Sequence, residues 1–169
     1  MYGGNGGLSI YDGQKFKTFT AEDGIPFGYV SAIMVEGTNI WLGTLDGLAL
    51  YNGKKFRIYK RDDGLIHRWI NCIKKGPKGN IWIGTAGGLS IFNGTQFENI
   101  WAQNGLTNHN VNDIYFDESG DAIIATQGGV YKYNGITFVR LDPKMGGHDF
   151  SLSQINQIIK SSDGIYWFN

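Results

Sequence analysis

The sequence is poor in cysteine and has no excess of either charge, and each of these scarcities excludes a class of protein. A single cysteine, Cys72, rules out an internal disulfide and a cysteine-rich metal site. The 15 basic residues balance the 15 acidic residues, so the surface lacks the basic excess that nucleic acids or anionic membranes require. No apolar run approaches the ~18 residues of a transmembrane helix, and the first residues show no signal-peptide pattern. We therefore expect no membrane segment, no signal peptide within the sequence, no nucleic-acid partner, no metal and no cofactor.

Glycine and aromatic residues are plentiful instead, with 26 Gly, 5 Trp, 9 Tyr and 10 Phe. The sequence Ile-Trp-Leu-Gly-Thr at residues 40–44 returns as Ile-Trp-Ile-Gly-Thr at residues 81–85, a spacing of 41 residues. Weaker copies follow at residues 123–126 and 166–169. A period of this length indicates an array of one supersecondary unit.

Two further sequence patterns repeat with the same spacing as the tryptophan pattern. Pairs of apolar runs are joined by Asp-Gly or Asn-Gly dipeptides, at Asp12-Gly13, Asn52-Gly53, Asn93-Gly94 and Asn134-Gly135. Such dipeptides predict two-residue β-hairpins of type I′. Short apolar runs that begin at Val30, Ile70, Val111 and Ile155 precede the tryptophan strand or its counterpart. One unit is therefore four short strands, A to D, and the absence of a long 3.6-residue apolar period predicts almost no helix.

A repeated four-stranded antiparallel unit of 40 to 45 residues is typical of a β-propeller blade. We expect an all-β fold, a β-propeller with about four blades' worth of sequence in a single array over residues 1–169. Its expected parts are a partial blade at 1–20, complete blades at 29–60, 70–101 and 111–141, and a partial blade at 155–169. The tryptophan of strand B is expected to fill the space between adjacent blades.

The residue pattern of the repeat resembles that of the two-component regulator propeller family. The resemblance is carried by Gly24-Ile25-Pro26, Val30, Ile33, Gly37, Ile40 to Thr44 and Gly47-Leu48, and again by Gly64-Leu65, Ile70, Ile73, Gly79, Ile81 to Thr85 and Gly88-Leu89. It implies a non-catalytic sensor module from the extracytoplasmic, periplasmic part of a bacterial hybrid two-component system. Such modules detect glycans or other nutrients and take part in signal transduction.

The two ends of the sequence correspond to complementary parts of one blade. Residues 1–8 align with Trp41 to Leu48, so the chain is expected to start within a strand B and to continue with strands C and D. The last residues supply strands A and B, around Trp167. The ends can pair within one chain to form a four-bladed ring, or between two chains in a head-to-tail homodimer of eight blades. Alternatively, the chain is a piece of a larger propeller. We favour the homodimer.

The loops between strand D and the next strand A supply the candidate ligand-binding residues, because loops on a rigid scaffold carry function. The last residues of these loops are expected to surround the mouth of the central channel. The candidates are Tyr29, Arg68, Trp69, His109, Asn110 and Gln154. Aromatic faces with polar side chains suit a glycan or another small molecule, although the same residues can equally pack over the channel as ordinary loop residues.

Two other functions remain open from the sequence. A lyase or hydrolase needs an acid–base pair, for which the channel mouth offers His109 and Asp113 beside Arg68. A structural or engineered propeller fragment would have oligomerisation as its only activity. Asp117 to Asp121 faintly resembles a calcium loop, but we expect a turn between strands A and B. Cys72 is expected to be a buried, inert thiol.

Overall fold

The computed structural model describes residues 7–26, 28–141, 144–145, 148–149 and 154–169, and it contains three four-stranded antiparallel sheets. The first sheet consists of β3 (Val30–Glu36), β4 (Asn39–Thr44), β5 (Gly47–Tyr51) and β6 (Phe56–Tyr59). The second consists of β7 (Ile70–Lys75), β8 (Ile81–Thr85), β9 (Gly88–Phe92) and β10 (Phe97–Ile100). The third consists of β11 (Val111–Phe116), β12 (Ala122–Thr126), β13 (Gly129–Tyr133) and β14 (Phe138–Leu141). Neighbours in each sheet are consecutive in the chain, so each sheet is a meander of strands A to D.

Three two-stranded sheets complete the described part of the chain. They are β1 (Leu8–Tyr11) with β2 (Phe16–Phe19), β15 (Lys144–Met145) with β16 (His148–Asp149), and β17 (Ile158–Lys160) with β18 (Tyr166–Phe168). The strand-B overlap expected at residues 1–6 lies outside the described residues.

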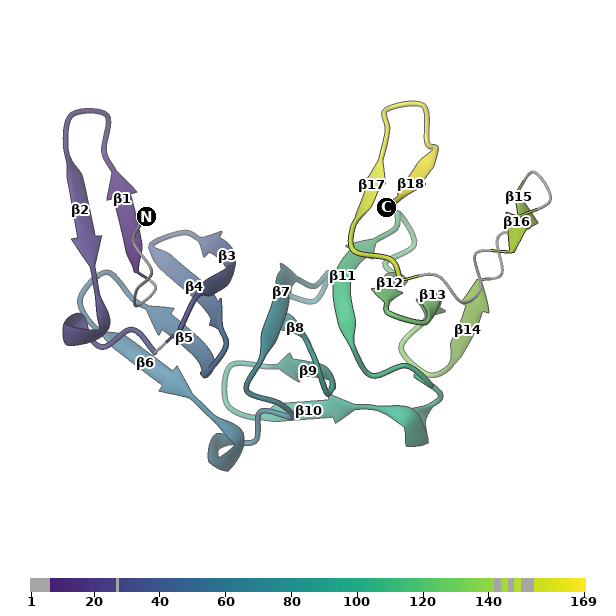
Figure 1. Cartoon of the computed structure of the whole chain (residues 1–169), viewed down its shortest axis with the longest axis horizontal. Coiled ribbons are helices and arrows are strands. Elements are labelled where there is room, and N and C mark those ends of the chain that lie inside the picture. The colour runs from purple at the N-terminus through teal and green to yellow at the C-terminus, as the bar shows by residue number, and fades with distance from the viewer. Residues whose placement is uncertain (1–6, 27, 142–143, 146–147, 150–153) are drawn as a thin grey trace.

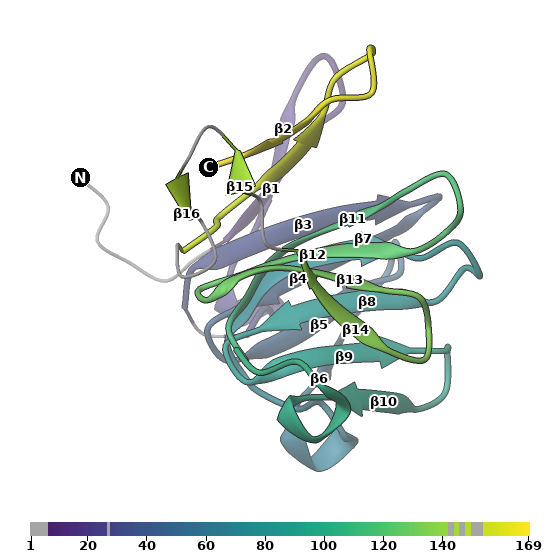
Figure 2. The ribbon, with the colours of Figure 1, turned by 90° about the vertical axis from the view of Figure 1, so that its right-hand side faces the viewer.

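The sheets fan out around a common centre and form an open arc (Figure 1). Strands β3, β7 and β11 are innermost, while β1–β2 and β17–β18 lie at the two ends of the arc (Figure 1). Figure 2, turned by 90°, shows the strands of each sheet running side by side. The all-β propeller architecture expected from the sequence is confirmed.

Helix is limited to three short 3₁₀ turns in the loops between strands D and A of successive blades, within the described residues. They are η1 (Ala21–Asp23), η2 (Arg61–Asp63) and η3 (Ala102–Asn104). The third residue of each turn accepts a hydrogen bond from the backbone N–H before the turn, as Asp63 Oδ2 does from Lys60 at 2.8 Å. A glycine with positive φ then ends each turn, as Gly64 does at φ 100°. Local capping therefore explains why these turns recur at one position of the repeat.

The four C–D hairpin turns lie where the sequence predicted them, but their type differs from the expected type I′. Type I′ requires positive φ at both central residues, and every positive φ in the described residues belongs to glycine. In the first turn Asp12 N–H donates to Lys15 O at 3.2 Å, which places Gly13 and Gln14 at the centre. Gly13 is therefore the only central residue with positive φ, whereas type I′ requires it at both. The Asp12 carboxylate accepts the N–H groups of Gln14 and Lys15, both at 2.9 Å, and so fixes the turn.

The hydrophobic core lies between the blades and is organised by the repeated tryptophan. Trp41 of β4 is 3% exposed and packs on Tyr59 of its own blade and Phe92 of the next. Trp82 of β8 repeats the arrangement with Phe116 and Tyr133 of the third blade. Burying an aromatic side chain removes roughly 150–250 Å² from water. The expected role of the strand-B tryptophan, filling the space between adjacent blades, is confirmed for both residues.

Candidate functional site: the channel mouth and the inner groove

The loops that precede the inner strands are tied to the turns between strands B and C. The carbonyl oxygen of Arg68 accepts the Gly47 N–H at 2.9 Å, and that of Trp69 accepts the Ala86 N–H at 3.1 Å. Asn110 O accepts the Gln127 N–H at 3.2 Å in the same way one blade later. The two sets of loops therefore form one face of the arc, which we call the channel mouth.

The most elaborate part of the channel mouth is the loop before β7. Trp69 is 45% exposed, and the Arg68 guanidinium carbon lies 5.9 Å from the centre of its ring. The His67 ring meets the Trp69 ring edge-on at 5.8 Å, and His67 Nδ1 accepts the Trp69 N–H at 3.1 Å. Burial lowers the pKa of His67, and the nearby charges of Arg61 and Arg68 add to this effect. This loop thus presents an exposed aromatic face beside a guanidinium and a neutral imidazole.

The other predicted residues are more scattered. Tyr29 precedes β3 and is 64% exposed. Asn110 Oδ1 accepts a hydrogen bond from Asn71 Nδ2 at 2.6 Å, and Gln154 Nε2 donates to Asn156 Oδ1 at 2.9 Å. Within the described residues, no hydrogen bond, ion pair or ring contact joins Tyr29 or His109 to the rest of the set. The predicted residues lie before successive inner strands, and the structure gives no closed pocket formed by all six.

A groove with a volume of about 360 Å³ lies on the inner side of the arc, where β3, β7, β11 and the segment at β17 face the centre. We call it the inner groove. Its polar lining comes from amides and one ion pair, namely Asn71, Asn112, Asn156, Gln157, Asn169 and the Lys74–Asp113 pair. Sequence reasoning placed the site at the channel mouth and gave the asparagines of this wall no role.

A β-bulge at the second residue of each inner strand explains the position of these amides. The pairing register shifts between Val30 and Ala32, between Ile70 and Cys72, and between Val111 and Asp113. A bulged residue is left out of the ladder and its side chain is re-aimed. Here each one reaches the next blade: Ser31 Oγ to Ile70 O at 2.5 Å, Asn71 Nδ2 to Val111 O at 2.9 Å, and Asn112 Nδ2 to Ile155 O at 2.7 Å.

The sequence contains a signal that could have predicted these hydrogen bonds between blades. Ser31, Asn71, Asn112 and Asn156 are polar residues at the second position of otherwise apolar strands. A polar side chain that recurs at one position of a buried strand indicates a required hydrogen bond, because burying it without a partner is costly.

Asp113 links three inner strands. Its carboxylate Oδ1 lies 2.8 Å from Lys74 Nζ of β7, and Oδ2 accepts the Ile158 N–H of β17 at 3.0 Å. The side chain is 9% exposed. Both carboxylate oxygens have partners, so the geometry describes an anchor between blades. The same geometry does not favour the general base considered from the sequence.

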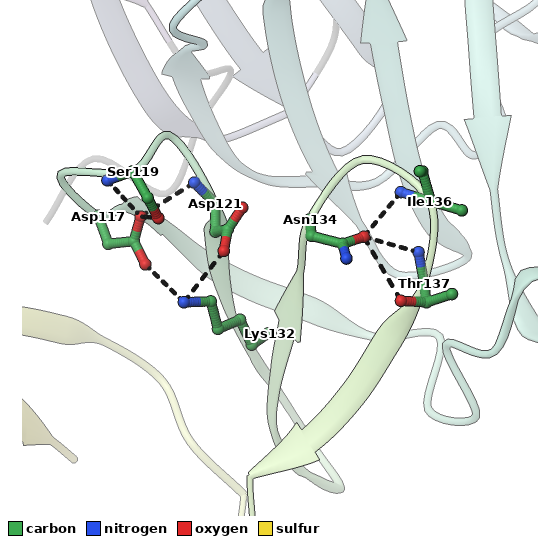
Figure 3. Close-up of polar contacts among 7 residues, drawn as sticks. All are labelled: Asp117, Ser119, Asp121, Lys132, Asn134, Ile136 and Thr137. Atoms are coloured by element: carbon green, nitrogen blue, oxygen red, sulfur yellow. Dashed lines mark hydrogen bonds and ion pairs between the residues drawn. The ribbon is translucent and has the colours of Figure 1, made fainter.

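The turn at Asp117 to Asp121 is the A–B turn expected from the sequence (Figure 3). Asp117 Oδ1 accepts the N–H groups of Ser119 and Asp121, both at 3.0 Å, and Lys132 Nζ lies between the two carboxylates at 2.9 and 3.0 Å. Burial alone would raise the pKa of Asp117, but hydrogen bonds from Ser119 and Lys132 outweigh it and lower the pKa to about 2. An ammonium group thus occupies the position between the carboxylates.

Metal-ligating and thiol chemistry have little support in the described part of the chain. No three His, Cys, Asp or Glu side chains gather there as a metal site would require. Cys72 is buried, as expected, and burial raises the pKa of its thiol to about 12. The thiol is therefore protonated and shielded at neutral pH, which makes it a poor nucleophile.

The fold and the repeated inter-blade interfaces define the class of protein as a β-propeller. Residues 64–87 match the model of the two component regulator propeller, the family that the repeated sequence resembles. No curated protein matches the chain significantly.

Solved propellers resemble the chain over almost its whole length. The extracellular domain of a hybrid two component system from B. thetaiotaomicron is 19% identical with a TM-score of 0.75, and the alignment covers 95% of this chain and 26% of that one. PorZ, a surface component of the type-IX secretion system of Porphyromonas gingivalis, is 14% identical with a TM-score of 0.75, over 98% and 28%. Virginiamycin B lyase from Staphylococcus aureus is 12% identical with a TM-score of 0.72, over 96% and 55%.

These similarities establish the fold. The chain spans about a quarter of the length of the extracellular domain of the hybrid two component system and about half that of the lyase. Among the described residues, no helix is long and apolar enough to cross a bilayer.

Proposed function

We propose that the chain is part of a non-catalytic ligand-binding and sensing propeller that takes a glycan or another small polar molecule. The observation that carries the proposal is the hydrogen bond between Asn110 and Asn71, which joins the channel mouth to the inner groove. A ligand that stacks on Trp69 at the channel mouth and extends into the inner groove would meet the amide side chains of the groove wall. Flat aromatic faces pack on sugar rings, and amides and guanidinium groups bond to hydroxyl groups.

We further infer that this sensing takes place outside the cytoplasm, in the periplasm of a bacterium. The inference is supported by the similarity to the extracellular domain of a hybrid two component system and by the matched repeat. In such a role, binding in the groove would be passed on as a signal through other parts of the protein.

A screen of oligosaccharides by glycan array, followed by calorimetry, tests the proposal. We expect Trp69→Ala and Arg68→Ala each to weaken binding of the best ligand by about tenfold, since an aromatic or charged contact of this kind contributes roughly 1–1.5 kcal/mol. Phe16→Ala is the matched control, because Phe16 is also an exposed aromatic residue but lies at the start of β2 beside a C–D hairpin turn, outside the channel mouth. Equal affinity of all three variants and the wild type contradicts the proposed site.

A lyase or hydrolase is the second candidate, because virginiamycin B lyase shares the fold. It has less support, since both carboxylate oxygens of Asp113 have partners, and no hydrogen bond, ion pair or ring contact among the described residues joins His109 to the other candidates. Turnover of a bound saccharide by the wild type, lost in His109→Ala, would favour this candidate over a binding module.

A further inference from the structure

A pocket with a volume of about 530 Å³ lies between the first and second complete blades, and we call it the inter-blade pocket. Its lining comes from strands β4 to β6 of the first blade and from the A–B and C–D turns of the second, where Gly79 and Asn93 lie. In a meander these turns are at the strand ends opposite to the D–A loops and the B–C turns. The inter-blade pocket therefore lies on the other face of the arc from the channel mouth.

The floor of the inter-blade pocket is aromatic. The ring of Trp41 lies 6.1 Å from that of Tyr59 and 5.8 Å from that of Phe92, measured between ring centres. The three side chains are only 3%, 3% and 4% exposed, so the cluster is held rigidly between the two blades. A rigid apolar floor with a few polar groups around it is the usual form of a small-molecule site.

This floor contains a hydrogen-bond donor that has no acceptor. Trp41 Nε1 is the one buried side-chain nitrogen or oxygen atom without a hydrogen-bond partner in the part of the chain that the structure describes. The corresponding Trp82 donates from Nε1 to Asn80 Oδ1 at 3.0 Å. Leaving a buried donor unpaired is costly, so an acceptor atom supplied by a ligand would be favoured beside Trp41.

The sequence of the A–B turn explains why the two tryptophans differ. Gly76 and Glu36 both lie opposite the asparagine found two residues before the tryptophan. A Cβ atom at Gly76 would collide with Asn80 Oδ1, so the hydrogen bond of the second blade requires glycine at this position. The first blade has Glu36 there, and its carboxylate pairs with Lys75 Nζ at 2.6 Å. The unpaired donor of Trp41 therefore follows from this one difference between the repeats.

Positive charge lies beside the aromatic floor. Lys55 and Arg57 both line the pocket, and the Arg57 guanidinium carbon is 4.7 Å from the centre of the Tyr59 ring. No ion pair joins either cation to a carboxylate within the described residues. Glu36 is the one carboxylate of the lining, and Lys75 neutralises it. The pocket thus has an excess of donors and of positive charge.

The equivalent pocket between the second and third blades has a different character. Its volume is about 330 Å³, and Glu98 occupies the position that Arg57 has in the first pocket. Gln96 takes the position of Lys55, and the tryptophan donor already has an acceptor. The preference for an anion is therefore specific to the inter-blade pocket and does not follow from the repeat as such.

We propose that the inter-blade pocket binds a small aromatic carboxylate. The ring would lie against the aromatic floor, and the carboxylate would accept the indole N–H of Trp41 and pair with the guanidinium of Arg57. Hydrogen bonds between ionised partners are stronger than those between neutral groups, which favours a carboxylate over an amide. This site is separate from the channel mouth, so the proposal does not depend on the glycan site there.

Nuclear magnetic resonance of isotope-labelled protein tests the site. The indole N–H signal of Trp41 can be assigned through its contacts with the rings of Tyr59 and Phe92. Cinnamate should shift this signal saturably, and cinnamamide, which has the same ring but no charge, should bind at least about tenfold more weakly. Inorganic phosphate, which has charge but no ring, should leave the signal unchanged. No saturable shift with cinnamate, equal affinity for cinnamamide or an equal shift with phosphate overturns the proposal.

Variants that exchange residues between the two pockets test the role of the cations. Arg57→Glu should weaken cinnamate binding by at least about tenfold. Lys55→Gln should weaken it by a smaller factor, because an exposed ammonium group contributes less. Lys54→Gln is the matched control, since Lys54 belongs to the same hairpin turn but does not line the pocket. All three positions are exposed, so the fold should be unchanged. Full affinity in Arg57→Glu, or equal loss in Lys54→Gln and Lys55→Gln, contradicts the proposed site.

Discussion

The tryptophan of the repeat occupies two different environments within one chain. In β4 and β8 it is buried against aromatic side chains that include those of the next blade, whereas in β18 it is 62% exposed. The strand position is the same in all three, so the difference comes from the neighbour. Blade stability in this array therefore depends on the interface with the next blade, as in other repeat proteins.

Removal of the enclosed tryptophan should have the largest effect. Trp82→Ala is expected to lower the free energy of unfolding by about 3–5 kcal/mol, since it leaves a cavity between the second and third blades. Urea denaturation measures the loss. Trp167→Ala should change it by less than about 1 kcal/mol, because this side chain is 62% exposed. Equal losses would show that the two environments do not differ in energy.

Removal of the anchor between inner strands should have the next largest effect. Asp113→Ala leaves Lys74 and the Ile158 N–H without their carboxylate partner and should cost about 1.5–3 kcal/mol. The loss should fall mainly on the end of the arc, so hydrogen exchange at Ile158 should accelerate more than at Ile83 in β8. Asp113→Asn keeps an acceptor for the Ile158 N–H and should lie between the wild type and Asp113→Ala.

Substitution of the buried Cys72, which lies between the second and third blades, should have a smaller and pH-dependent effect on the free energy of unfolding. Burial raises the pKa of Cys72 from 9.0 to about 12, so its contribution to stability is complete below pH 9 and is lost as pH rises towards 12. The stability of the wild type relative to Cys72→Ala should therefore fall between pH 9 and 12. At pH 8 iodoacetamide should modify the thiol in urea but not in the native protein. Rapid native labelling would contradict the buried environment.

The turn at Asp117 should show the smallest effect, with the opposite pH dependence. Its pKa of about 2 lies below the ordinary 3.8, so this contribution is present above pH 3.8 and is lost as pH falls towards 2. Lys132→Met should remove part of it, by less than about 1 kcal/mol near neutral pH. The difference in stability between Lys132→Met and the wild type should shrink in acid. A difference that stays constant between pH 5 and 2 would contradict the ion-pair account.

Much of the architecture could be predicted because the repeat supplies several copies of each signal. The hairpins, the role of the strand-B tryptophans and the scarcity of helix could all be predicted, because the same residue patterns recur at the same position of each repeat. The type of the hairpin turn could not, because Asp12 and its equivalents use their side chains to hold the turn and leave positive φ to glycine. Dipeptide identity alone does not distinguish these geometries.

The candidate site was predictable only in part. The positions of Trp69 and Asn110 before the inner strands follow from the alignment of the repeats. The role of Asn71 and Asn112 depends on the bulges, which add one unpaired residue to each inner strand and turn its side chain towards the next blade. Nor does the sequence show that Asp113 bonds to β17, which begins 45 residues later.

Hydrogen exchange followed strand by strand tests the comparison between the enclosed and the exposed tryptophan most directly. We predict that the amides of β8, whose Trp82 is 8% exposed, are strongly protected, whereas those of β18, whose Trp167 is 62% exposed, exchange much faster. Equal protection of β8 and β18 would contradict the dependence of blade stability on the next interface.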